Sequence, residues 1–274
     1  MRSGLHWFLS ELLGTFLLVL FGCGSVATAV ALAAPVGLFQ VAIVWGLGLA
    51  LAITLTGPHS GAHLNPAITV AFAVWTDFPK KRTVGYFGAQ FLGAFLAAAT
   101  LYALFGPAIA HFESVAGIER GAPGSEASAM IFGEFFPNPG GQPWDPAANE
   151  IVGPVQAWLA EFLGTALLAL GIFGLTAKGN PFAAGKFTPL AIGLLLTSLI
   201  CLFAPISMAG FNPARDLAPR LFSALTGWKS YAFTANGSGW LTVYVISPVL
   251  GAVAGGWLGC RLFSRSVDDA AAKG

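Results

Sequence analysis

The sequence predicts an all-α membrane protein in which six helices cross the bilayer and two shorter helices enter it only part-way. The first observation is composition: of 274 residues, 56% are hydrophobic and 9% are charged, with a mean hydropathy of +0.75, as expected of a chain folded in lipid. The second is a series of long apolar segments. The third is the triplet Asn-Pro-Ala, which occurs twice within apolar sequence.

Six apolar segments are long enough to cross a bilayer, for which a helix needs about 20 residues. The first contains Glu11 and is much longer than the apolar core of a signal peptide, so we expect a membrane span and not a cleaved leader. Glycines such as Gly88, Gly93 and Gly251 fit close packing between the helices. The six segments lie at about residues 6–32, 38–57, 83–106, 153–177, 186–204 and 239–263.

Each Asn-Pro-Ala triplet is predicted to start a helix, because proline suits the first helical position and asparagine is a favourable N-cap. The apolar stretches that follow, at about 66–76 and 213–225, are too short to cross the bilayer, so we expect two re-entrant half-helices. Helix starts at this depth are tolerated only where protein or water surrounds them, which indicates a solvated path through the membrane. The triplets are Asn65-Pro66-Ala67 and Asn212-Pro213-Ala214.

The chain contains an internal repeat. Glu11-Leu-Leu-Gly-Thr resembles Glu161-Phe-Leu-Gly-Thr, and each motif precedes an Asn-Pro-Ala triplet by a similar distance. Each half, at about 6–106 and 153–263, holds three spans and a half-helix, so the halves must insert with opposite topology. We expect a single transmembrane channel domain over 1–274, in which the half-helices enter from opposite faces and the two asparagines meet near the midplane.

The distribution of charge predicts the orientation of the chain. Basic residues gather on one side of the six spans. The connection 107–152 lies on the other side, and its charged residues are mainly acidic. By the positive-inside rule, both termini are expected in the cytoplasm and this connection outside it. With no cleaved leader predicted, a bacterial inner membrane is the expected location. The basic residues on the first side are Arg2, Lys80, Lys81, Arg82, Lys178, Lys186, Arg261, Arg265 and Lys273.

Three polar residues are expected to line the path. The carboxamides of Asn65 and Asn212 can cap local backbone with their oxygens and offer N–H donors to a solute, while two converging helix starts would repel protons and cations. Arg215 directly follows the second triplet. A charge at this depth is costly, so we expect Arg215 to face a wet cavity.

Glu11 and Glu161 are acids at equivalent positions of the two halves. We expect them to give structural polar support by accepting hydrogen bonds from backbone around the half-helix starts; a proton relay is the alternative. His59 and His63 are four residues apart, but they precede a helix started by proline and no carboxylate or cysteine joins them. No nucleophile–base pair is recognisable at this depth either, so no metal, cofactor or enzymatic activity is expected. The net charge of +1 gives no indication of nucleic-acid binding.

With these motifs the chain resembles the major intrinsic protein family, the aquaporin and glycerol-facilitator superfamily, over about residues 6–263. The resemblance implies an aquaporin-like fold, one narrow pore per subunit and a homotetramer. Asp216, directly after Asn-Pro-Ala-Arg, is similar to the glycerol facilitators, as is Trp45 at the position of their constriction tryptophan.

The resemblance also implies which solutes pass. Glycerol facilitators usually have glycine and phenylalanine where this chain has Ile200 and Ala209. With these two residues, the constriction is more similar to that of the plant nodulin-like branch. That branch is associated with glycerol, ammonia and, in some members, metalloid hydroxides. We expect a passive channel for glycerol and water that excludes protons and ions. The alternatives are a water or metalloid-hydroxide channel of the arsenite type, and a coupled transporter with the two buried glutamates as proton carriers. The implied constriction consists of Trp45, Ile200, Ala209 and Arg215.

Overall fold

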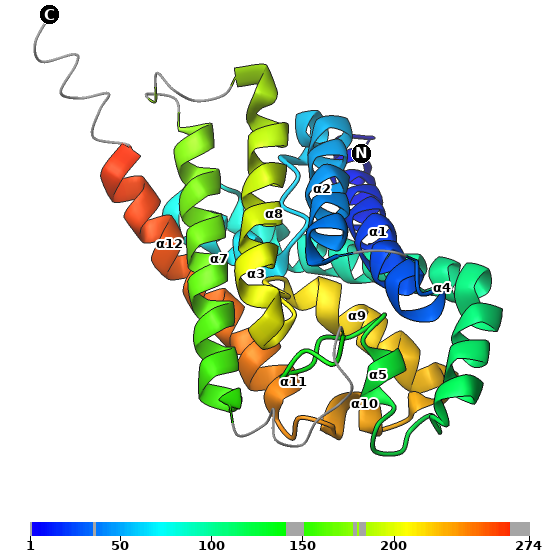
Figure 1. Cartoon of the computed structure of the whole chain (residues 1–274). Helices are drawn as coiled ribbons and strands as arrows, with labels where there is room; N and C mark the ends of the chain where they lie inside the picture. Colours follow the sequence, from blue (N-terminus) through cyan, green and yellow to red (C-terminus); the bar gives the residue numbers. More distant parts are fainter. Residues whose placement is uncertain (1, 35–36, 141–150, 178–179, 181–184, 264–274) are drawn as a thin grey trace, which may run out of the picture.

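The computed structural model describes residues 2–34, 37–140, 151–177, 180 and 185–263, which form a bundle of helices (Figure 1). Within these residues, six helical segments are long and apolar enough to cross a membrane, and the prediction of an all-α protein with six spans is confirmed. The segments are α1 (Arg2–Ala31), α2 (Leu38–Ser60), α4 (Thr83–Ala116), α7 (Pro154–Thr176), α8 (Thr188–Ser207) and Gly239–Phe263, which comprises α11 (Gly239–Leu241), a π-helical turn (Thr242–Ile246) and α12 (Ser247–Phe263).

The two predicted half-helices are present. α3 (Pro66–Trp75) and α9 (Pro213–Ser223) both begin with proline at the first helical position, after an asparagine N-cap in extended conformation. At 10 and 11 residues, both are too short to cross a bilayer. Further short elements lie between the long helices: Lys80–Arg82, α5 (Glu126–Ala129), Gly185–Phe187, Ala224–Trp228 and α10 (Tyr231–Thr234).

The helices of the two halves make corresponding contacts. In the first half α1 packs along α4, and in the second half α7 packs along α12. Each half-helix contacts the last span of the other half, α3 against α12 and α9 against α4, while α2 and α8 pack against each other. This correspondence is what an internal repeat predicts; the opposite insertion of the halves stays a prediction.

Glycines at equivalent places allow the helix backbones to touch. A Cβ atom on Gly93 would lie 2.2 Å from the carbonyl oxygen of Leu12 in α1, and one on Gly251 would lie 2.3 Å from that of Phe162 in α7. Because no side chain fits at such distances, these glycines set the separation of the two helix pairs. Gly88 differs from the prediction: no atom lies within 4 Å of its Cβ position, and the residue is exposed.

α4 is longer than predicted. The third span is expected to end near residue 106, whereas α4 continues through Pro107 to Ala116. Its last turns are held by the folded part of the connection, because Ile109 is fully buried and the nearly buried Glu113 pairs with Arg120 at 2.8 Å. These contacts offset the backbone hydrogen bond that Pro107 cannot donate.

The described chain begins and ends on the same side of the bundle. α1 begins and α12 ends at one end (top in Figure 1), and α5, α10 and α11 lie at the opposite end. An even number of spans requires this arrangement. Which end faces the cytoplasm stays a prediction, and Lys178, Arg265 and Lys273, on which it partly depends, lie outside the described residues, as does the segment 141–150 of the connection.

Candidate pore

Two loops with unusual backbone lead into the half-helices. One joins α2 to Asn65, and the other joins α8 to Asn212. In both loops φ is positive at the residues four, three and one before the asparagine, a conformation that strains any residue except glycine. These residues are Gly61, Ala62 and Leu64 in the first loop and Met208, Ala209 and Phe211 in the second. Such backbone persists only where the surrounding structure imposes it.

Glu11 of α1, which is fully buried, holds the first loop. Its carboxylate accepts hydrogen bonds from the backbone N–H groups of His63 and Leu64 at 2.9 and 2.8 Å, and from the side chain of Gln90 at 2.8 Å. A trans peptide is planar, so its carbonyl points opposite to its N–H. The carbonyls of Ala62 and His63 therefore point away from Glu11, towards the cavity that these residues line.

Glu161 of α7 holds the second loop with the same kind of contacts. It accepts hydrogen bonds from the N–H groups of Gly210 and Phe211 at 2.8 and 2.7 Å, and from the hydroxyl of Ser207 at 2.7 Å. By the same geometry, the carbonyls of Ala209 and Gly210 point away from this carboxylate. The contacts of both glutamates are those expected of structural polar support.

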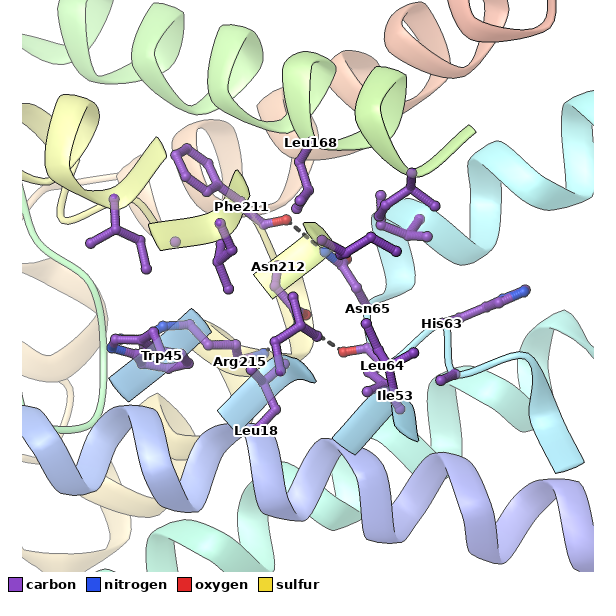
Figure 2. Close-up of a pocket in the computed structure, with 18 of the residues that line it drawn as sticks. Leu18, Trp45, Ile53, His63, Leu64, Asn65, Leu168, Phe211, Asn212 and Arg215 are labelled. Carbon is purple, nitrogen blue, oxygen red and sulfur yellow. Dashed lines mark hydrogen bonds between the residues drawn. The ribbon is translucent and has the colours of Figure 1, made fainter. Parts of the chain in front are cut away.

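Asn65 and Asn212 meet where the two half-helices start (Figure 2). The oxygen of each carboxamide accepts a hydrogen bond from the backbone of its own helix, at 2.8 Å for Asn65 and 3.0 Å for Asn212. The nitrogens donate to the opposite loops at 2.8 Å, Asn65 to the carbonyl of Phe211 and Asn212 to that of Leu64. Each carboxamide has a second N–H, and both asparagines line a cavity. The other members of the triplets are buried in the first helical turns: Pro66, Ala67, Pro213 and Ala214.

An inner cavity of about 130 Å³ runs past the two asparagines. Trp45 and Arg215 lie together at one end of it, and His63 lies at the other (Figure 2). The two loops form a polar part of its wall through their backbone, and the spans form an apolar part. The apolar side chains include Leu18, Leu49, Ile53, Leu168, Ile192 and Leu196.

A larger outer cavity of about 800 Å³ is lined by α1, α2 and the connection, including Met130 and Asn138. The two cavities share four lining residues, which therefore surround the neck between them. Three of these belong to the predicted constriction; the fourth predicted member, Ala209, lines the inner cavity alone. The shared residues are Trp45, Ile200, Met208 and Arg215.

Arg215 is 4% exposed, and its guanidinium contacts three groups. Its Cζ atom lies 4.5 Å from the centre of the Trp45 ring, a cation–π contact. One nitrogen donates to the carbonyl of Phe132 at 3.2 Å, and another forms an ion pair with Glu134. The indole and the connection thus orient Arg215 towards the neck.

Asp216, the next residue in α9, links this helix to the connection. It accepts a hydrogen bond from the backbone N–H of Glu134 at 2.7 Å and pairs with Arg220 at 2.7 Å. Arg220 in turn donates to the carbonyls of Glu134 and Ala232. α9 is thereby joined to the connection through a buried network that includes two ion pairs.

The sequence does not predict three residues of this region: Phe132, Glu134 and Met208. Phe132 and Glu134 lie in the connection, far along the chain from Arg215, and no periodic pattern places them. A signal for Glu134 exists, because it is the only charged residue in the apolar run 130–136. For Met208 the sequence has no signal. Among the described residues, no three His, Cys, Asp or Glu side chains gather as a metal site would require.

Similarity to known proteins agrees with this geometry. A model of the family described as major intrinsic protein matches residues 2–258. The chain belongs to the major intrinsic protein family. Within it, the glycerol uptake facilitator protein of Haemophilus influenzae is 39% identical over 253 residues, 91% of this chain and 90% of that protein. The glycerol uptake facilitator protein of Escherichia coli is 36% identical over 260 residues, 94% and 88% of the two chains.

A propanediol uptake facilitator of Salmonella typhimurium is 37% identical over 247 residues, which cover 90% of this chain and 89% of that protein. Among solved structures, the aquaglyceroporin of Plasmodium falciparum superposes with a TM-score of 0.79 at 24% identity and covers 96% of this chain and 98% of that one. At this identity the superposition establishes the fold of a major intrinsic protein, which confirms the predicted fold class.

Proposed function

We propose that this protein is a passive channel for small uncharged polyols, with glycerol as the main solute and water as a second one. The observation that carries the proposal is the two-sided wall of the inner cavity, where apolar side chains of the spans accompany backbone carbonyls of two loops. A polyol exposes both hydroxyl and C–H groups. It can exchange its hydration for hydrogen bonds to the carbonyls while its carbon chain lies against the apolar wall.

The relatives support the same class of solute. Those from H. influenzae and E. coli are named for glycerol uptake, and the one from S. typhimurium for propanediol uptake. Both molecules are uncharged and combine hydroxyl groups with a short carbon chain. We infer that solute moves down its own gradient without chemical change and without a cofactor.

Each functional residue has a role in this mechanism. At the neck, Arg215 donates to solute hydroxyl groups while the Trp45 ring contacts the C–H side. Beyond the neck, the second N–H groups of Asn65 and Asn212 donate to a solute oxygen where two helix starts meet, and the partial positive charges there repel protons and cations. Among the described residues that line either cavity, Arg215 is the only Lys, Arg, Asp or Glu.

We also propose that the protein is a homotetramer in a bacterial inner membrane with both termini in the cytoplasm. The family resemblance supports the tetramer, and the position of the cluster Lys80–Arg82 supports the orientation under the positive-inside rule. Cross-linking in detergent tests the first part, with dimers or monomers as the contrary result. Protease access to a C-terminal tag in intact cells tests the second, and cleavage from outside contradicts it.

Stopped-flow light scattering on proteoliposomes tests the solute. A glycerol gradient should produce swelling much faster than in protein-free liposomes, and an osmotic step should show accelerated water flux. Fast water flux with glycerol at the protein-free rate would reject the polyol channel. Arsenite uptake is measured in the same vesicles, because arsenite flux that exceeds glycerol flux and resists competition by glycerol would favour the metalloid-hydroxide alternative.

A further inference from the structure

Met208 lies in the neck between the inner and outer cavities. It lines both of them, a position that it shares with Trp45, Ile200 and Arg215. Ala209, the next residue in the chain, lines the inner cavity alone. Since Met208 is 8% exposed, the little surface that it retains borders these two cavities. A side chain in this place limits the cross-section of whatever passes.

The backbone at this position suits glycine better than methionine. Met208 has φ 66° and ψ −4°, in the left-handed region. In the first loop the corresponding residue, also four before the asparagine, is Gly61, with φ 83°. Methionine in this conformation carries strain that glycine avoids. The second loop thus has a strained residue with a side chain in the neck, whereas the first loop has a glycine without a side chain at the corresponding position.

Contacts with the connection fix the position of the Met208 side chain. The backbone N–H of Phe135 donates to the sulfur of Met208 at 3.2 Å. The same side chain packs in an apolar cluster with Met130 and Phe135 of the connection. The connection therefore positions Met208 in the neck and, through Phe132 and Glu134, positions Arg215 as well.

The structure assigns Met208 as a residue that determines solute size, forming with Trp45, Ile200 and Arg215 the wall of the neck in place of Ala209. The assignment rests on the proposed polyol channel and specifies its solutes. Unbranched polyols with the cross-section of glycerol pass, whereas polyols that are wider because a carbon is branched are excluded. A thioether is flexible, but the contact with Phe135 opposes its displacement from the neck.

The test compares the flux of pentaerythritol, a branched polyol, with that of glycerol in proteoliposomes. Met208→Gly should raise the pentaerythritol-to-glycerol ratio roughly tenfold, the scale at which one or two methylene groups matter in an apolar pocket. Met208→Leu, of similar volume, should keep the wild-type exclusion. Ala209→Gly changes the neighbouring residue in the same loop and should shift the ratio far less than Met208→Gly.

Lys229→Gly is the matched control, because Lys229 is exposed, has φ 53° and lines neither cavity. It should leave both fluxes unchanged. A folded Met208→Gly channel with the wild-type ratio, or an equal rise in Ala209→Gly, overturns the assignment; Met208→Ala replaces Met208→Gly if the glycine variant does not fold. Wild-type glycerol flux at the protein-free rate would instead reject the proposed function. In that case Met208 stays supported if Met208→Gly opens a glycerol flux, and is rejected if it does not.

Discussion

Each buried arginine near the neck has an acidic partner. Arg215 pairs with Glu134, and Arg220 pairs with Asp216, so two cations and two anions are buried together. A buried guanidinium without a partner would be costly. With its charge compensated, Arg215 can offer donors to a neutral hydroxyl without creating a site that holds an anion. This balance suits a channel for uncharged solutes.

Glu134→Gln removes the partner charge of Arg215 and keeps the side-chain volume. Breaking a buried ion pair from one side costs on the order of 3 kcal/mol, so we expect a clearly lower midpoint of thermal unfolding in detergent and a lower glycerol flux. Glu113→Gln is the control, because the Glu113–Arg120 pair is partly exposed and neither residue lines a cavity. Equal losses of flux in the two variants would contradict a specific role of Glu134.

Asn65→Asp tests the pair of asparagines. Aspartate is still a good N-cap, but it places an oxygen where the carboxamide nitrogen donates to the carbonyl of Phe211 at 2.8 Å. An unmatched buried acceptor costs about 1–3 kcal/mol, so glycerol flux should fall roughly tenfold. Asn236→Asp makes the same change at a carboxamide that donates to the carbonyl of Phe136 and lines neither cavity. A comparable loss there would show that the effect does not arise at the asparagine pair.

How far residues are predictable depends on how far their partners lie along the chain. Asn65, Asn212 and Arg215 are recognisable because motif and helix start coincide in the sequence. Glu134 is defined by contacts between the connection and α9, and Met208 by contacts between the second loop and the connection, over 73 residues in the case of Phe135 and Met208. No local pattern encodes such a contact. Only the folded chain therefore shows that Met208, and not Ala209, lies in the neck beside Trp45, Ile200 and Arg215.

At the scale of elements, the triplet explains how a helix can begin inside a membrane. Pro213 has no N–H, the next two N–H groups bond to the Asn212 side chain, and that of Asp216 bonds to the Asn212 carbonyl. The Asp216 bond is the first regular i→i−4 bond of the helix, so the first three helical positions leave no N–H without a partner. The carboxamide oxygen of Asn212 is thus used within α9, while its N–H groups remain directed to the opposite loop and the cavity.

Gly93→Ala tests the contact between α1 and α4. Its Cβ would lie 2.2 Å from a backbone carbonyl, which cannot move without shifting α1. Forced overpacking of this kind costs about 1–3 kcal/mol, so we expect a lower midpoint of thermal unfolding in detergent and reduced yield. Gly88→Ala is the control in the same helix, since its Cβ position is open, and the higher helix propensity of alanine should leave stability equal or slightly higher. An undisturbed Gly93→Ala protein would show that the helices are not in backbone contact.

Helix boundaries follow the sequence where local chemistry defines them. Both half-helices begin at their predicted proline because cap and proline act within a few residues. The end of α4 departs from the prediction by ten residues, because burial of Ile109 and Glu113 against the connection outweighs the local preference of Pro107 to end a helix. Proline is a reliable sign of a helix start here and a poor sign of a helix end.

At the scale of the whole molecule, the two buried glutamates also decide between a channel and a coupled transporter. A transporter would need Glu11 and Glu161 to bind and release protons during each cycle. Their carboxylates instead hold the backbone of the two loops that line the cavity, so protonation would turn one acceptor oxygen of each into a donor and weaken the contacts of the loop. Glycerol flux should therefore be proportional to the glycerol gradient, without saturation, and unaffected by an imposed pH difference.

Glu161→Gln separates the two mechanisms further. Glutamine keeps one acceptor oxygen but replaces the other with a donor, which would face the N–H of either Gly210 or Phe211. The second loop should be destabilised, and glycerol flux should fall by the same factor with and without a proton gradient, because the defect lies in the shape of the pore. Flux is measured in proteoliposomes with and without a protonophore. If wild-type flux collapses when the gradient is dissipated, and Glu161→Gln removes only that part of the flux, the protein is a proton-coupled transporter and not a passive channel.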